Sequence, residues 1–357
     1  MDRAVTRAGR FRHVIFPDSV GGYGRAVKLA RLARVGTADN AVFTGLGPAC
    51  PQLAADVRWA FPPPPPLPAH ASGHLTGVDP PGVGRDGGLG ADAESFLAGL
   101  FAHVGLGLRH YKPETLHRRL PACLRVLRAT SLAHARSVLQ RQPHLAPEAV
   151  DALVIGVTSF FRDPAVFDTL RRLVLPDLIA DSRARRRPLR VWSAGCSDGA
   201  ELYSVAMLLS EFGGAGDDCG VGIELLGTDC RPNAVAAAAE GVYDPAAVAG
   251  VPPELLQRHF DFDGARYRVN GALRAATQWK VADVLRAGDA PPGSFDLVLC
   301  RNVVIYLQPS ATASAWSLLT RSLRPGGGVL VAGKAERPVG VRGLRPVAPC
   351  LYRRGVA

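Results

Sequence analysis

The sequence predicts an α/β protein with a parallel, doubly wound sheet that follows a helical segment. Short apolar runs at 189–192, 223–227, 295–300 and 329–332 have the length and composition of buried strands. Helical stretches at 201–212, 232–239 and 310–323 alternate with these strands. Repeated strand–helix units favour a parallel sheet with helices on both faces.

Residues 92–155 are predicted to be helical. One apolar helix face is formed by Phe96, Leu97, Leu100 and Phe101. A second helix is expected to begin at Pro113 and to continue along a stripe made by Leu116, Leu120, Leu124 and Leu127. Because Pro121 lies inside this stripe, we expect it to kink the helix or to divide it in two. A further helix opens at 146 and runs to about 157.

The chain is predicted to have four parts. Residues 1–61 form a poorly structured basic extension, with a small docking element at 23–35 as the alternative. Residues 62–90 contain eight prolines and seven glycines, which is typical of a linker. A helical domain at 91–157 and a sheet domain at 158–357 follow. The strand–helix pattern breaks at about 241–280, which predicts an insertion with a short helix near 254–260 and a hairpin around Tyr267.

Composition limits the classes of function. The net charge of +11 favours an acidic partner, either a carboxylate-rich protein, nucleic acid or a membrane surface, although an arginine-rich composition alone could explain it. Seven scattered cysteines without a C-x-x-C pair argue against disulfides or a metal site. No apolar run is long enough to cross a bilayer, and the start lacks the layout of a secretory signal, so we expect a cytoplasmic protein.

Three polar motifs follow predicted strands, at the edge where open α/β sheets bind ligands. A turn built on Gly195 and Gly199 precedes Glu201 at the start of a helix, and its small residues allow a nucleoside-type ligand close to the backbone. Asp229 ends the next strand and can accept both hydroxyls of a ribose, or alternatively cap the helix from Pro232. Arg301, Asn302 and Tyr306 follow a third strand, where a core or capping role is the alternative.

A fourth motif precedes the sheet. The run from Thr158 to Pro164 reads Thr-Ser-Phe-Phe-Arg-Asp-Pro. Its two phenylalanines can clamp an adenine or a thioether, and Arg162 can orient a carboxylate by a bidentate contact. Taken singly, Phe160 and Phe161 also suit a hydrophobic core.

In this order the four motifs resemble those of the CheR-type methyltransferases, over about residues 92–352. These enzymes use S-adenosylmethionine to methylate glutamate side chains of bacterial chemoreceptors. The resemblance implies a Rossmann-like class I methyltransferase domain with an inserted small β-subdomain, preceded by a small all-helical domain. The chain departs from the usual family pattern at Asp198, Ala200 and Leu202 in the glycine turn, at Gly156 in place of an asparagine, and at 333–336, where Gly-Lys-Ala-Glu replaces Gly-His-Ser-Glu.

The resemblance also assigns site residues. It places Arg162 and Tyr306 near the transferred methyl group as the catalytic pair. It implies cofactor contacts for Thr158, Ala194, Gly195, Gly199, Glu201, Asp229, Asp283, Val284, Arg301 and Asn302, and no metal. The acceptor carboxylate is already a nucleophile at neutral pH because the reference pKa of glutamate is about 4.3, so no general base is required.

The helical domain suggests the partner. Between residues 109 and 141 there are eight Lys/Arg against one acid, Glu114. Such a surface suits an acidic helical region of a chemoreceptor or a related signalling protein. Nucleic acid is then a less favoured partner, and a membrane would be reached only through the receptor. Two alternatives remain: a methyltransferase of the same fold acting on RNA or a small molecule, and a homologue that binds cofactor or receptor without catalysis.

Overall fold

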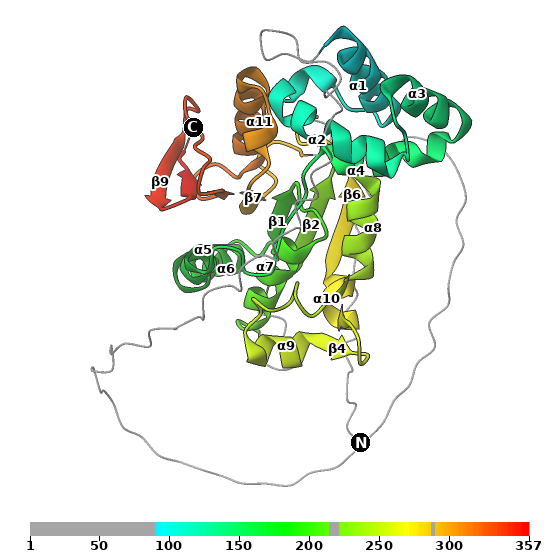
Figure 1. Ribbon diagram of the computed structural model, residues 1–357. Helices are drawn as coiled ribbons and strands as arrows, with labels where there is room; N and C mark the ends of the chain where they lie inside the picture. The colour runs from blue at the N-terminus through cyan, green and yellow to red at the C-terminus, as the bar shows by residue number, and fades with distance from the viewer. Residues whose placement is uncertain (1–89, 214–220, 287–289, 357) are drawn as a thin grey trace, which may run out of the picture. The chain divides into compact units, whose positions relative to one another are not determined.

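A computed structural model describes residues 90–213, 221–286 and 290–356. The predicted N-terminal extension, and all of the predicted linker except Gly90, lie outside these residues. The described part contains a helical segment, a seven-stranded sheet with its helices, and a three-stranded sheet (Figure 1). The predicted fold class is confirmed.

The helical segment lies next to the carboxyl ends of the central strands (Figure 1). Its helices are α1 (Ala91–His103), α2 (Pro113–Val126), α3 (Leu132–Arg141) and α4 (Ala146–Leu153), with single 3₁₀ turns at Leu108–His110 and Pro143–Leu145. Pro121 does not divide α2, which corrects that alternative. Because Pro121 is exposed, water can satisfy the carbonyl group that its missing N–H leaves free. The last helix ends four residues earlier than predicted, since Val154 adopts an extended backbone.

The large sheet has the strand order β6-β2-β1-β7-β8-β10-β9. Its strands are β1 (Leu189–Ala194), β2 (Ile223–Asp229), β6 (Thr277–Val281), β7 (Leu297–Cys300), β8 (Val329–Ala332), β9 (Leu344–Ala348) and β10 (Leu351–Arg354). The first five strands in this order are parallel, as predicted, whereas β10 runs antiparallel to both of its neighbours. The prediction of a wholly parallel sheet was therefore wrong at this edge. Only two residues join β9 to β10, and such a short connection permits only an antiparallel pair.

Alternate residues of the central strands enter two different cores. In β7, Leu297 and Leu299 pack in one hydrophobic cluster, while Val298 and Cys300 pack in the other. The strand β8 divides in the same way. This alternation follows from the period of two of a strand, and it explains why both strands are apolar throughout.

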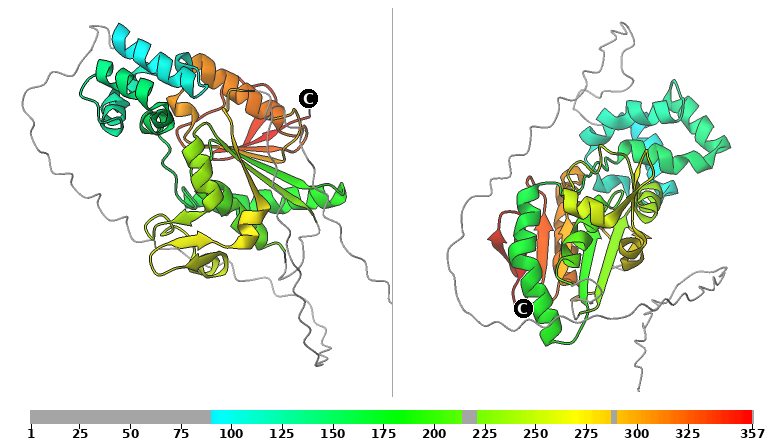
Figure 2. Two further views of the ribbon diagram at one scale, coloured as in Figure 1. Left: turned by 90° about the vertical axis from the view of Figure 1, so that its right-hand side faces the viewer. Right: turned by 90° about the horizontal axis from the view of Figure 1, so that it is seen from below.

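Helices cover both faces of the sheet, as Figure 2 shows. They are α5 (Pro164–Thr169), α6 (Leu175–Ala184), α7 (Ala200–Ser210), α8 (Pro232–Glu240) and α11 (Pro309–Ser322). A π-helical segment, Leu170–Val174, joins α5 to α6. Buried residues of α5–α7 belong to one core, and those of α1–α4 and α11 belong to the other.

A small antiparallel sheet lies between α8 and β6 in the chain. It contains β3 (Val242–Tyr243), β5 (Tyr267–Val269) and β4 (Phe260–Phe262), with α9 (Pro253–His259) before β4 and α10 (Gly271–Ala276) after β5. The predicted helix and hairpin are both present. The predicted insertion ran too far, however, because β6 pairs with β2 in the large sheet.

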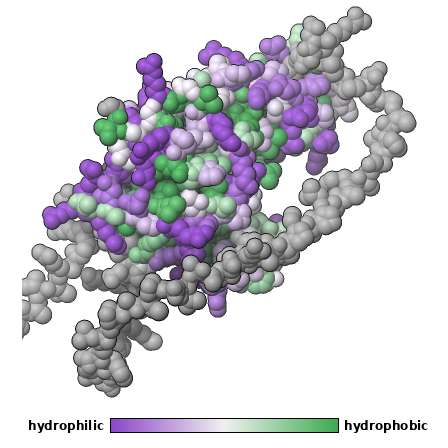
Figure 3. Space-filling model, turned by 90° about the vertical axis from the view of Figure 1, so that its left-hand side faces the viewer, coloured by the Kyte–Doolittle hydropathy of each residue, from purple (hydrophilic) through white to green (hydrophobic). Residues whose placement is uncertain are grey.

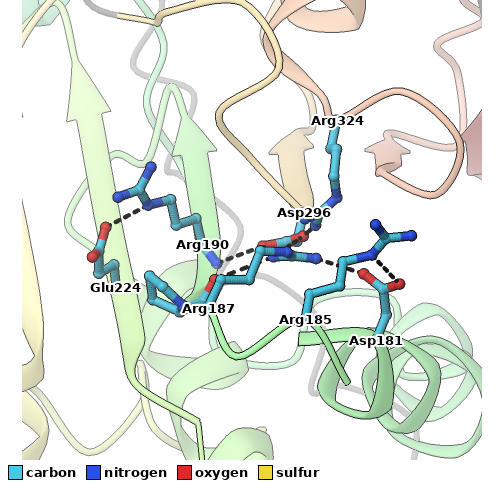
Figure 4. Close-up of polar contacts among 8 residues, drawn as sticks. Asp181, Arg185, Arg187, Arg190, Glu224, Asp296 and Arg324 are labelled. Atoms are coloured by element: carbon cyan, nitrogen blue, oxygen red, sulfur yellow. Dashed lines mark hydrogen bonds and ion pairs between the residues drawn. The ribbon is translucent and has the colours of Figure 1, made fainter. Parts of the chain in front are cut away.

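A buried ion-pair cluster fixes the amino-terminal edge of the large sheet, opposite the site described below (Figure 4). Asp296 is 1% exposed and directly precedes β7. Its carboxylate accepts hydrogen bonds from Arg187 at 2.9 and 3.0 Å and from the backbone N–H of Arg190 at 2.8 Å, and it forms an ion pair with Arg324. This acid therefore joins the start of β7 to β1 and to the segment before β8.

On the face drawn in Figure 3, apolar groups lie interspersed with polar ones. Exposed apolar side chains include Leu173, Val339 and Val347. No helix in the part of the chain that the structure describes is long and apolar enough to span a membrane.

Candidate functional site

A cavity of about 70 Å³ lies at the carboxyl ends of β1, β2 and β7. The chain passes from β1 outward to β2 and β6 and then crosses to β7 on the other side of β1. Such a point, where the strand order reverses, is where open α/β sheets bind ligands. Of the predicted site residues, those on the cavity wall are Gly195, Asp229, Asp283, Val284, Arg301, Asn302 and Tyr306.

The glycine turn after β1 requires glycine at both of its ends. Gly195 has a φ of +78°, and a Cβ there would lie 2.4 Å from the Val303 side chain. Gly199 has a φ of +91°, and a Cβ there would lie 2.7 Å from the ring of Trp279. Of these two, only Gly195 reaches the cavity wall, and Ala194 is buried beside it. The turn thus lines the cavity at Gly195 and Ser197 and packs against β6 at Gly199.

Asp229 lies at the end of β2 and is 5% exposed. Its carboxylate accepts hydrogen bonds from the backbone N–H of Ser197 at 2.9 Å and from that of Arg231 at 3.0 Å. The guanidinium of Arg231 donates two more, from Nε at 3.0 Å and from Nη2 at 3.3 Å. The N-cap residue of α8 is Arg231, and no side chain caps that helix. Asp229 is therefore not the capping residue that the alternative interpretation required.

Glu201 does not line the cavity but contacts Arg301, which does. It accepts a hydrogen bond from Ser193 at 2.9 Å and pairs with Arg301 Nη1 at 3.3 Å. Burial raises the pKa of Glu201, and the positive charge of Arg301 opposes that rise. Arg301 also donates from Nη2 to the carboxylate of Asp163 at 2.6 Å and to the carbonyl of Arg162 at 2.9 Å. Arg301 therefore connects the first turn of α7 with the motif that carries Arg162.

Arg162 stands on a strained turn. Both of its neighbours have left-handed backbones, with a φ of +51° at Phe161 and +62° at Asp163. Strain of this kind persists only where surrounding contacts enforce it, and it is concentrated at functional sites. The Arg162 guanidinium donates to the carbonyl of Val157 at 2.9 Å and forms no ion pair with a described residue. Most of its N–H groups are therefore free to bind an anion.

Neighbouring residues hold this turn in place. The N–H of Phe161 donates to Ser204 at 3.0 Å, and Asp163 pairs with Lys334 at 2.6 Å. Although burial raises the pKa of Asp163, its bond to Lys334 and the charge of Arg301 lower that pKa overall. The rings of Phe160 and Phe161 pack in the core rather than on the cavity wall, as the simpler interpretation predicted. Thr158 is half-buried before this turn and does not line the cavity.

The loop that carries Asn302 and Tyr306 is fixed by Glu336, for which the sequence indicated no role. The Glu336 carboxylate is 2% exposed. It accepts backbone N–H groups from Asn302, Val303 and Val304 at 2.8 to 3.0 Å. A fourth N–H, from Gly333, donates at 2.7 Å. The signal was present in the last residue of the Gly-Lys-Ala-Glu run, where this chain keeps the glutamate of the Gly-His-Ser-Glu motif, but the motif alone indicated no function for that glutamate.

The helical segment also contributes to the site, which sequence reasoning missed. Tyr111 lies on the cavity wall and forms an isolated β-bridge with Leu307. The adjacent Lys112 donates from its backbone to the carbonyl of Tyr306 at 3.0 Å and from Nζ to that of Ile305 at 2.8 Å. The loop of Tyr306 is thus held from the side of the helical segment as well.

The residues present fit an adenosyl cofactor. The side-chain oxygen of Asn302 is buried, lines the cavity and has no hydrogen-bond partner among the described residues, so it can accept from a ligand. Asp229 ends the second strand, where a ribose binds in folds of this type. The backbone at Gly195 leaves no side chain in the way. Among the described residues, no group of three or more His, Cys, Asp or Glu is placed to hold a metal ion.

This sheet order, with a glycine turn after β1 and an acid at the end of β2, defines a Rossmann-like fold of the kind that binds a nucleoside-containing ligand at this edge. The chain belongs to the CheR methyltransferase family: the family model described as "CheR methyltransferase, SAM binding domain" matches residues 156–348. Its cofactor is S-adenosylmethionine.

Curated relatives cover most of the described chain. The chain is 34% identical to chemotaxis protein methyltransferase 1 of Pseudomonas aeruginosa over 69% of this chain and 90% of that protein. It is 32% identical to chemotaxis protein methyltransferase Cher2 of Pseudomonas putida over 69% of this chain and 90% of that protein. Among solved structures, a TehB-like SAM-dependent methyltransferase from Corynebacterium glutamicum is 16% identical over 63% of this chain and 97% of that one, with a TM-score of only 0.29.

Proposed function

We propose that this protein transfers a methyl group from S-adenosylmethionine to glutamate side-chain carboxylates of chemoreceptors, in signalling adaptation. The observation that carries the proposal is the placement of Arg162. Its guanidinium stands on a strained turn, and Arg301, a residue of the cavity wall, binds its carbonyl group. The names of the relatives support methylation in chemotaxis.

The chemistry requires positioning more than proton transfer. When bound, the cofactor supplies an activated methyl group on a sulfonium. A glutamate carboxylate is ionised at neutral pH, because its reference pKa is about 4.3, and needs no base. Arg162 holds this carboxylate by a charge-assisted contact, and Tyr306 bounds the space that the carboxylate enters. Holding the reacting atoms in line in this way can lower the activation free energy by several kcal/mol, and by up to about 7–11 kcal/mol in well-oriented systems.

The helical segment is the proposed docking surface for an acidic receptor helix. Arg118, Arg125 and Arg128 are all exposed, on α2 and immediately after it. A group of exposed cations attracts an acidic partner over roughly a Debye length, about 8 Å at physiological salt. Because Tyr111 and Lys112 directly precede α2, the same segment reaches both the cavity and the proposed docking surface.

The test is transfer of label from S-adenosylmethionine to purified chemoreceptor. We expect base-labile methyl esters on receptor glutamates. Label that appears on RNA or a small molecule, and not on the receptor, would favour a different substrate. Cofactor binding in calorimetry without turnover on any acceptor would show a binding protein instead of an enzyme.

A further inference from the structure

The guanidinium of Arg231 is bound to Asp229, the acid that a cofactor ribose would use. It donates to both oxygens of Asp229 and, through Nη2, to the hydroxyl of Ser197 at 3.2 Å. With the two backbone donors, Asp229 accepts four hydrogen bonds, which uses about all of the lone-pair sites of a carboxylate. A ribose can therefore bind Asp229 only if the Arg231 side chain leaves it.

The shape of the cavity leads to the same conclusion. Arg231 lines the cavity and is 8% exposed. A Cβ on Gly156 would lie 1.9 to 2.1 Å from the Arg231 guanidinium, so this side chain fills the space over Gly156. The remaining cavity, about 70 Å³, is smaller than the roughly 300 Å³ at the lower end of ordinary ligand pockets. Movement of Arg231 enlarges the cavity on the side of Asp229.

A second acceptor for Arg231 lies in the helical segment. Asp151, in α4, accepts from Asn233 of α8 at 2.8 Å through Oδ2. Its Oδ1 is buried and has no hydrogen-bond partner among the described residues. Burial raises the pKa of Asp151, and the hydrogen bond from Asn233 and the charge of Arg231 oppose that rise. Arg231 is therefore close enough to interact with Asp151 electrostatically while it is bonded to Asp229.

We infer that Arg231 sets the affinity of the cofactor site by exchanging between two acids. In the arrangement seen here it pairs with Asp229. When a cofactor ribose takes Asp229, Arg231 turns to the unpaired oxygen of Asp151. Cofactor affinity is then the balance of these two pairs, and cofactor occupancy changes a contact between α8 and α4 of the helical segment. This inference rests on the proposed site for S-adenosylmethionine.

The experiment titrates S-adenosylhomocysteine into the full-length protein by calorimetry. Arg231→Met removes the competitor of the ribose and should tighten binding about tenfold, the effect of one hydrogen bond to a charged group. Asp151→Asn removes the charge of the second acceptor and should weaken binding about threefold or more. In the Arg231→Met background the Asp151→Asn change should have no effect, because the two residues act through one contact.

Arg190→Met is the matched control, since it removes another arginine–acid pair, with Glu224, from β1 and β2. This variant should bind as the wild type does. Thermal unfolding of each variant, without ligand, separates a folding defect from a change in affinity. If Arg231→Met binds equally or more weakly while folded, the inference is wrong. If neither the wild type nor any variant binds S-adenosylhomocysteine, the cofactor site itself is wrongly assigned.

Discussion

Glu336 accepts the backbone N–H of Asn302 at 2.8 Å, and this bond ties the segment after β8 to the loop after β7. Asn302 has a φ of +60°, a backbone that is uncommon for a residue other than glycine. The carboxylate of Glu336 compensates this cost, because it also binds the next two N–H groups of the same loop. A single buried acid thus positions both the unpaired oxygen of Asn302 and the backbone leading to Tyr306.

Glu336→Ala should therefore impair both stability and catalysis. It leaves four N–H groups without an acceptor, two of them buried and two half-buried, at a cost of about 1–3 kcal/mol for each group that water does not reach. We expect a loss of unfolding free energy of more than about 3 kcal/mol and at least a tenfold lower rate of transfer. Glu336→Gln keeps one carbonyl oxygen and should lose less. Urea unfolding measures the loss of stability, and single-turnover methylation measures the loss of rate. Equal losses in the two variants would contradict this account, because the oxygen that glutamine keeps should still accept part of these hydrogen bonds.

Arg162→Ala should abolish methyl transfer and leave cofactor binding nearly intact. The side chain forms no ion pair with a described residue and does not line the cavity, so its loss leaves the cavity wall unchanged. Transfer to receptor and calorimetry with S-adenosylhomocysteine separate the two effects. Arg162→Lys keeps the charge without the planar fork and should retain only part of the activity. Wild-type transfer by Arg162→Ala would refute its role.

The sequence predicted the sheet and much of the site because both depend on local patterns. The strands β7 and β8 are short apolar runs bounded by polar residues, and the glycines at 195 and 199 are required by their own backbone angles. Of the predicted cofactor residues, Asp229 and Asn302 line the cavity because Asp229 ends a strand and Asn302 lies in the loop after one.

The remaining features depend on contacts between distant residues. In the sequence, Asp229 and Arg231 indicate only the start of a helix. In the structure, Arg231 binds Asp229 because Gly156, 75 positions earlier, has no side chain and leaves room for the guanidinium. The bond from Lys112 Nζ to the carbonyl of Ile305 joins residues 193 positions apart. The strands β9 and β10 escaped prediction because most of their residues are exposed or half-buried and follow no clear alternation.

Lys112→Met should slow transfer without unfolding the protein. It removes the bond from Nζ to the carbonyl of Ile305 but keeps the backbone bond to Tyr306. The loop of Tyr306 then keeps its two backbone bonds to the helical segment, from Lys112 to Tyr306 and from Gln308 to His110, but loses the side-chain bond, so we expect a several-fold lower kcat, with the affinity for S-adenosylhomocysteine nearly unchanged. Arg109→Met, at an exposed position three residues earlier in the same segment, is the control. An unchanged kcat in Lys112→Met would show that the two backbone bonds are sufficient.

Asp296→Ala should be among the most destabilising single changes in the sheet. The acid is 1% exposed and neutralises Arg187 and Arg324, so its removal takes this partner from Arg324 and leaves Arg187 with Asp181 alone (Figure 4). Breaking a buried pair in this way costs about 3–5 kcal/mol. Urea unfolding measures the loss, with Glu224→Ala as the control for an exposed pair, where about 0–1 kcal/mol is expected. A loss below 1 kcal/mol for Asp296→Ala would contradict this account.

His259 should make the protein less stable as the pH falls below neutrality. The side chain is 6% exposed at the end of α9, and its Nε2 lies 3.0 Å from the hydroxyl of Ser210 in α7. Burial, together with the charge of Arg258, lowers the pKa of His259 below its ordinary value of about 6.5. The unfolded chain therefore binds a proton at a higher pH than the folded protein does, and stability is lost as the pH falls through about 6.5. Between pH 7.5 and 5.5, we expect the melting temperature of the wild type to fall more than that of His259→Gln. The difference should correspond to the protonation of one histidine. Identical pH profiles for the two proteins would show that protonation of His259 does not limit the packing of α9 against α7.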